Sequence, residues 1–112
     1  NKLTCISNLW LRQMVFKKAG DANEGHEHNY DHVTLLTNGS VKVHVDGQIS
    51  EFVAPQVIYI QKGKSHFIEA GEDNTIAFCV HALRDNETGE ILSQDQVPLG
   101  INAVMQGLTK PL

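Results

Sequence analysis

Short runs in which hydrophobic and polar residues alternate recur along most of this chain. The clearest run covers residues 41–45, where three valines alternate with Lys42 and His44. Such alternation is typical of a β-strand with one buried face, because successive strand side chains point to opposite sides. Less regular runs of similar length and composition also predict strands. The expected strands cover residues 8–17, 32–37, 41–45, 48–53, 57–60, 65–70 and 75–83.

Turn residues separate these runs at intervals of roughly eight to twelve residues. Asn38-Gly39 and Asp46-Gly47 are dipeptides that two-residue hairpin turns favour, so we expect a tight hairpin at each. No long segment shows the 3.6-residue periodicity of a helix. Short, regularly spaced strands without such a helix predict an all-β sandwich or barrel. We expect residues 1–7 to pair at a sheet edge or with a partner subunit, whereas the tail after Pro98 is open between a short helix and an extended arm.

The composition narrows the class of protein. The chain has 112 residues, 41% hydrophobic and 20% charged, and a formal charge of -4. Its nine Lys and Arg are dispersed, so no basic stripe is available for nucleic-acid phosphates. It has no apolar run long enough to span a bilayer and no signal-peptide pattern. Cys5 and Cys79 are interpreted as reduced thiols rather than a disulfide. We therefore expect a single cytoplasmic domain over residues 1–112, with no nucleic-acid or membrane partner.

Four of the six histidines lie in two short stretches. His26, His28 and His32 fall within seven residues, and His66 follows a glycine turn farther along the chain. In an extended segment His26 and His28 project to one face, because strand side chains repeat every two residues. Imidazole nitrogen suits divalent transition metals better than Ca or Mg. We therefore predict a mononuclear metal site with His26, His28, His32 and His66 as ligands.

Four neutral ligands leave the 2+ charge of the metal uncompensated. This charge favours an anionic or enolate-like oxygen donor and lowers the pKa of bound water. An octahedral ion held by four ligands keeps two positions for a bidentate substrate, or for a substrate together with dioxygen. The other two histidines are weaker candidates for metal ligands. His44 is expected on the face opposite the valines, and His81 closes the most hydrophobic run.

The spacing of these residues resembles the two sequence motifs of the cupin superfamily. The positions that match the first motif, G-x5-HxH-x3,4-E-x6-G, are Gly20, His26, His28, His32 and Gly39. The positions that match part of the second motif, G-x5-PxG-x2-H-x3-N, are Gly63 and His66. His32 replaces the usual glutamate, so the chain is similar to the four-histidine subset of small cupins. The resemblance covers about residues 8–83 and implies a double-stranded β-helix, the jelly-roll cupin barrel, with N- and C-terminal arms.

The resemblance also implies a cofactor and a class of activity. Members of the four-histidine subset resemble manganese- or iron-binding proteins, some with oxidative activity; Ni, Co, Zn and Cu are the alternatives. We expect a metal-dependent oxidoreductase that carries out dioxygenase-type oxidation of a small oxygenated molecule. A non-redox sugar or uronate isomerase or lyase stays open, as does a non-catalytic small-molecule binding module. The exposed apolar edge expected of a jelly roll, together with the two arms, predicts a homodimer.

Several side chains near the predicted ligands are candidates for the pocket. Arg12 or Gln13 could hold a carboxylate or hydroxyl of a substrate, and Tyr30 lies between two ligands in the sequence. By alternation, Ile68 and Ala70 share the face of His66. Either Ile58 or Tyr59 is expected to line the pocket from the neighbouring strand. The full set of catalytic or pocket candidates is Arg12, Gln13, Tyr30, Tyr59 and His81.

Overall fold

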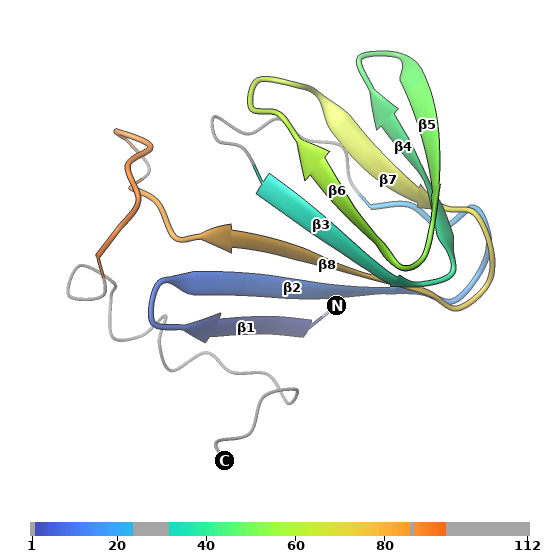
Figure 1. Ribbon diagram of the computed structural model, residues 1–112, viewed down its shortest axis with the longest axis horizontal. Coiled ribbons are helices and arrows are strands. Elements are labelled where there is room, and N and C mark those ends of the chain that lie inside the picture. Colours follow the sequence, from blue (N-terminus) through green and yellow to red (C-terminus); the bar gives the residue numbers. More distant parts are fainter. Residues whose placement is uncertain (1, 24–31, 86, 94–112) are drawn as a thin grey trace.

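The computed structural model consists of antiparallel β-strands in two sheets that face each other across a common core (Figure 1). It describes residues 2–23, 32–85 and 87–93. Its strands are β1 (Lys2–Ile6), β2 (Leu9–Phe16), β3 (His32–Asn38), β4 (Ser40–Val45), β5 (Gln48–Val53), β6 (Gln56–Ile60), β7 (His66–Ala70) and β8 (Thr75–Ala82). These residues contain no helix, and every strand expected from the alternation is present, so the all-β prediction is confirmed.

The sheet topology brings strands that are distant in sequence side by side. The larger sheet has the order β1-β2-β8-β3-β6, and the smaller sheet has the order β5-β4-β7. After β3 the chain crosses to the smaller sheet for β4 and β5, returns for β6, crosses again for β7 and returns for β8. As expected for residues 1–7, β1 pairs at a sheet edge, where it lies antiparallel to β2. The tail after residue 93 lies outside the described residues.

The two predicted hairpins have different outcomes. The Asp46-Gly47 turn joins β4 to β5 within one sheet, and both residues have the positive φ angles (47° and 80°) that a type I′ turn requires. The hairpin predicted at Asn38-Gly39 is wrong, because β3 and β4 belong to different sheets. Gly39 instead lies at the corner between the sheets, with φ of 84°, where a Cβ atom would collide with the side chain of Thr75.

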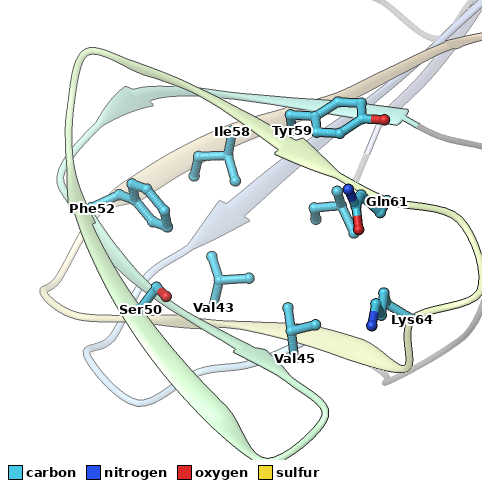
Figure 2. A pocket seen from close by; sticks show the side chains of 9 residues that line it. Val43, Val45, Ser50, Phe52, Ile58, Tyr59, Gln61 and Lys64 are labelled. Atoms are coloured by element: carbon cyan, nitrogen blue, oxygen red, sulfur yellow. The ribbon is translucent and has the colours of Figure 1, made fainter.

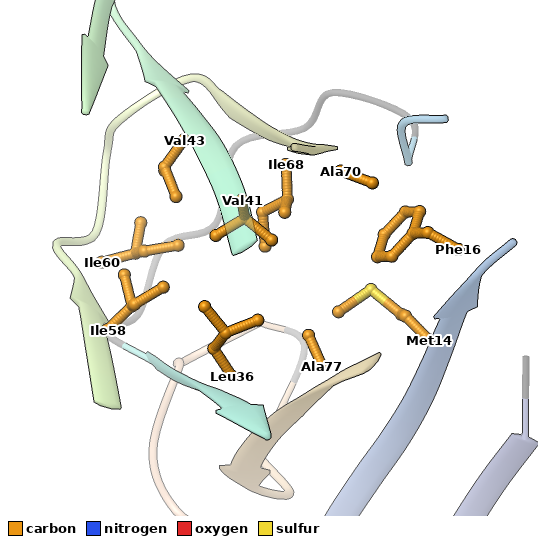
Figure 3. Packing of buried hydrophobic residues seen from close by; sticks show 10 residues of the cluster. All are labelled: Met14, Phe16, Leu36, Val41, Val43, Ile58, Ile60, Ile68, Ala70 and Ala77. Atoms are coloured by element: carbon orange, nitrogen blue, oxygen red, sulfur yellow. The ribbon is translucent and has the colours of Figure 1, made fainter. Parts of the chain in front are cut away.

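The core lies between the two sheets and is built from one face of each strand. In Figure 3, Val41 and Val43 of β4 and Ile68 of β7 pack over residues of the larger sheet. The remaining buried members are Met14, Phe16, Leu36, Ile58, Ile60, Ala70 and Ala77. The burial of alternate residues confirms that the valines of residues 41–45 face inward. Within the described residues no helix is long and apolar enough to cross a membrane.

Candidate metal centre

His66, the first residue of β7, is the predicted ligand that the structure describes in full. Its side chain is 3% exposed, and Ile68 and Ala70 are buried on the same face of the strand, as the alternation predicted. The sheet register places His66 directly opposite Val45 of β4. Residues opposite each other in an antiparallel pair share a face of the sheet. His66 therefore lies on the inner wall of the barrel, where an ion could be held away from bulk water.

A backbone contact fixes the form of the His66 ring. Its Nδ1 atom lies 3.1 Å from the carbonyl oxygen of Lys64. A carbonyl oxygen can only accept a hydrogen bond, so Nδ1 is the donor. In the neutral imidazole the lone pair is then on Nε2, which is the form that metal-binding histidines adopt when a backbone carbonyl orients them. The ring is thus buried, oriented and in a tautomer that suits coordination through Nε2.

The other three predicted ligands are described only in part. His26 and His28 lie outside the described residues, as does the pocket candidate Tyr30. His32 begins β3 opposite Ile60 of β6, but its side chain also lies outside the described part of the chain. Within the described residues, no three His, Cys, Asp or Glu side chains gather as a metal site. The four-histidine ligand set therefore stays a prediction.

The histidine segment is defined here as residues 24–32, which carry His26, His28 and His32. The described residues at its two ends are both attached near the same end of the barrel. On the N-terminal side, the backbone N–H of Asn23 donates to the carbonyl of Ile68 at 3.1 Å, and the N–H of Ile68 donates to Asn23 Oδ1 at 2.7 Å. Residues 20–23 thus run antiparallel along β7, in the direction of His66. On the C-terminal side the segment ends at the start of β3, which lies at the same end of the barrel as the start of β7 (Figure 1).

An apolar cavity of about 340 Å³ opens between β4, β5 and β6. Figure 2 shows Val43 and Val45 of β4 facing Ile58 of β6 across it. The other residues that line it are Ser50, Phe52, Tyr59, Ile60, Gln61 and Lys64. Val45 is the register partner of His66 and Ile60 is the partner of His32, so the cavity borders the positions of two predicted ligands. Its size and apolar lining suit a small organic molecule.

The structure separates the pocket candidates by face. Arg12 lies on the same face of β2 as the buried Met14 and opposite Cys79 of β8, whereas Gln13 lies on the other face. Tyr59 is 58% exposed and lies at the rim of the apolar cavity, while Ile58 is the inward residue of β6. Of the candidates that the structure describes, Arg12 and His81 lie on the inner face of the larger sheet, whereas Gln13 and Tyr59 lie on its outer face.

The sequence analysis named His81 as a pocket candidate but did not connect it with Trp10, and it did not single out Cys79 or Thr34 on the inner face. Trp10 stacks on His81, with ring centroids 4.5 Å apart. The Sγ atom of Cys79 lies 3.8 Å from the hydroxyl of Thr34. Burial raises the pKa of the Cys79 thiol, although the contact with Thr34 and the charge of Arg12 act in the opposite direction. Trp10 and Arg12 share a face because they are two residues apart in a strand, but only the register of β2 against β8 shows that His81 and Cys79 are their neighbours.

No protein-family model and no curated protein matches the sequence. Solved structures do match. KdgF from a Halomonas species has a TM-score of 0.64 at 16% identity, over 77% of this chain and 79% of that chain. A cupin superfamily protein from Desulfitobacterium hafniense has a TM-score of 0.63 at 17% identity, over 74% of each chain.

A third match bears directly on the type of barrel. An RmlC-like cupin family protein from Methanocaldococcus jannaschii, described as having a double-stranded β-helix fold, has a TM-score of 0.65 at 15% identity, over 74% of this chain and 77% of that chain. At these identities the similarity concerns the fold, and it agrees with the strand order and the two-sheet core described above. The chain therefore has the fold of a small cupin, the double-stranded β-helix.

Proposed function

We propose that this protein is a metal-dependent enzyme that holds manganese or iron through His26, His28, His32 and His66 and oxidises a small oxygenated molecule. The proposal rests mainly on the burial and the orientation of the His66 ring. Its imidazole is buried on the inner wall of the barrel, and its Nδ1 donates to a backbone carbonyl. Metal-binding histidines commonly donate the N–H of the other ring nitrogen to a backbone carbonyl in this way.

Two backbone arrangements support the rest of the ligand set. Asn23, three residues before His26, is hydrogen-bonded to Ile68, two residues after His66 in β7. His32 begins β3 and is the register partner of Ile60 at the end of β6. The segment that carries three of the proposed ligands thus starts and ends close to the inner wall on which His66 lies.

The residues around the apolar cavity would bind and shield a small substrate. Val43, Val45 and Ile58 offer apolar contacts, and the polar groups of Ser50 and Gln61 are available to orient a substrate oxygen. When bound, manganese or iron would supply Lewis-acid activation of an oxygen donor and, as a redox-active ion, the capacity for dioxygen chemistry. The protein would contribute an apolar wall beside the ligands.

Metal analysis of variants tests the ligand set. We expect the purified protein to bind about one transition-metal ion per chain, measured by inductively coupled plasma mass spectrometry. His66→Ala should weaken metal affinity by more than the roughly 10- to 100-fold that is typical for the loss of a residue that only supports a ligand. His44→Ala is the matched control, since His44 bonds to Glu69 at 2.9 Å and stacks on Phe67, away from the inner face. It should retain the metal.

Other outcomes would refute particular parts of the proposal. Failure to bind any of Mn, Fe, Ni, Co, Cu or Zn would rule out the metal centre. If His26→Ala abolished binding and His32→Ala left it unchanged, His32 would not be a ligand. Oxygen consumption with small diketones, catechols and carboxylic acids tests the oxidative reaction. A redox-silent native metal, with no oxygen consumed, would favour the non-redox isomerase or lyase instead.

A further inference from the structure

Arg12 is a partly buried cation that lines a second cavity, of about 430 Å³. One wall of this cavity comes from β2, with Met14 and Phe16, and the other comes from residues 21–23, which lead into the histidine segment. Among the described residues no hydrogen bond or ion pair engages the Arg12 side chain. Arginine is seldom buried without a partner. This guanidinium is therefore available to a ligand.

Asn23 offers a second donor from the opposite wall. Its Oδ1 accepts a hydrogen bond from the backbone of Ile68 at 2.7 Å, which fixes the orientation of the amide. Its Nδ2 contacts only the sulfur of Met14, at 3.8 Å, and thioether sulfur is a weak acceptor. The amide N–H groups of Asn23 can therefore donate to a ligand in the cavity. A guanidinium and an amide on facing walls form a donor set suited to a carboxylate.

The nearby titratable groups leave the charge of Arg12 uncompensated. Asp21 also lines the cavity, but it is exposed, its Oδ2 accepts from the backbone of Lys18 at 3.2 Å, and it forms no ion pair with Arg12. Cys79 lies opposite Arg12 in the register, but burial raises its pKa, so the thiol stays neutral. A bound anion would thus meet a positive charge that no described residue neutralises.

We propose that Arg12 and Asn23 bind the carboxylate of the substrate, which makes the substrate a small carboxylic acid rather than a neutral sugar, diol or diketone. The inference rests on the proposed function, because it places the carboxylate end of the metal centre's substrate in this cavity, one wall of which runs along β7 towards His66. It is also consistent with that centre, since four neutral ligands leave a positive charge that favours an anionic molecule. Arg12 recognises the carboxylate by a charge-assisted, two-pronged hydrogen bond, and Asn23 adds a neutral one.

The chain contains only two arginines, Arg12 and Arg84, so ¹⁵N-arginine labelling gives a direct readout by NMR. Arg84 is an internal control, because its Nη1 donates to the carbonyl of Gly89 at 2.9 Å. The protein is titrated with benzoate and pyruvate, and with benzamide and pyruvamide as neutral counterparts, both free of metal and loaded with diamagnetic Zn²⁺. We expect the Arg12 Nε resonance to shift in a saturable way with at least one carboxylate and with neither amide, while the Arg84 resonance stays in place.

Substitution of Arg12 measures how much its guanidinium contributes to carboxylate affinity. Arg12→Gln should weaken carboxylate binding about 10- to 100-fold, the range expected for losing a charged hydrogen-bond partner. Lys17→Gln makes the same change of charge at an exposed position just after β2 and should bind like the unaltered protein. If Arg12→Gln does not fold, the Arg12 resonance of the unaltered protein still decides the question.

Three results would overturn the inference: no saturable shift with either carboxylate, an equal shift with the amides, or unchanged binding in Arg12→Gln. Metal content is measured on the same samples, so the two proposals can fail separately. A protein that binds no metal but shows an Arg12-dependent carboxylate site would refute the proposed function and support this site. A metal-loaded protein whose Arg12 does not respond would refute this site alone.

Discussion

Trp10 and His81 illustrate how a strand pair sets the chemistry of single residues. They are register partners in β2 and β8, and their rings stack with centroids 4.5 Å apart and 24° between planes. Burial lowers the pKa of His81, and the charge of Arg84 lowers it further, whereas the hydrogen bond with the carbonyl of Ala82 raises it. The net direction is downward, so His81 stays neutral in the folded protein at a pH where an unfolded chain would begin to protonate it.

The tryptophan beside it makes this pKa measurable. Trp10 is the only tryptophan in the chain, and a protonated imidazole quenches the fluorescence of a stacked indole. We expect acid quenching of Trp10 fluorescence with a midpoint below the ordinary histidine value of about 6.5. His81→Phe keeps a stacked ring but cannot be protonated, so this transition should disappear. A midpoint at or above the ordinary value would contradict the assignment.

The same shift predicts how stability depends on pH. Because the pKa of His81 is lower in the folded state, the unfolded chain takes up the proton first as the pH falls. The stability that neutral His81 contributes is therefore complete above about pH 6.5 and is lost as the pH falls from there towards the folded-state pKa. Urea unfolding at about pH 8 and about pH 5.5 tests this, and His81→Phe should show a smaller difference between the two than the unaltered protein.

At the scale of elements, the hydrophobic pattern predicted strands better than it predicted their connections. Alternation and turn signals located β2 to β8 to within about one residue at each end. They do not report which strands pair. Asn38-Gly39 and Asp46-Gly47 have the same local turn signal, yet one lies at a corner between sheets and the other closes a hairpin. The difference is set by long-range pairing of β3 with β6 and β8.

These two glycines should respond differently to substitution. Both have positive φ angles, which cost a residue with a Cβ atom roughly 1–2 kcal/mol. At Gly47 an added Cβ meets nothing within 4 Å, so Gly47→Ala should cost only about that amount. At Gly39 the Cβ also collides with Thr75, a buried residue, and overpacking adds about 1–3 kcal/mol. Equal losses in the free energy of unfolding, measured with urea, would contradict the corner geometry.

At the scale of the whole molecule, the candidate site shows what a single sequence can and cannot supply. Alternation predicted that Ile68 and Ala70 share the face of His66, and the structure shows that this face is the buried one. The choice of Arg12 over Gln13 required the position of β2 in the barrel, because either face of an isolated strand can be the buried one. The role of Asn23 depends on hydrogen bonds with Ile68, 45 residues away, which leave no local pattern in the sequence.

We propose that exposed apolar residues on the outer surface of the molecule form the interface of the predicted homodimer. Val53 is 71% exposed, and Ile49, Val57 and Tyr59 are also exposed large side chains. All four belong to β5 and β6, which are edge strands of the smaller and larger sheets. Large exposed apolar side chains gathered on edge strands are candidates for an interaction surface. A second copy of the chain would cover it symmetrically.

Charged substitutions on these strands test the dimer. In Val53→Glu/Val57→Glu, two exposed apolar residues become acidic, so paired copies would bring like charges together in an apolar contact, and the dimer should dissociate. Exposed substitutions typically change stability by no more than about 0.5 kcal/mol, so the barrel should stay folded. Sedimentation velocity at several concentrations should show a dimer for the unaltered protein and a monomer for the double variant. Val15→Glu, an exposed apolar position on β2, is the control and should remain dimeric. A monomeric unaltered protein, or a double variant that stays dimeric, would mean that β5 and β6 do not form the interface.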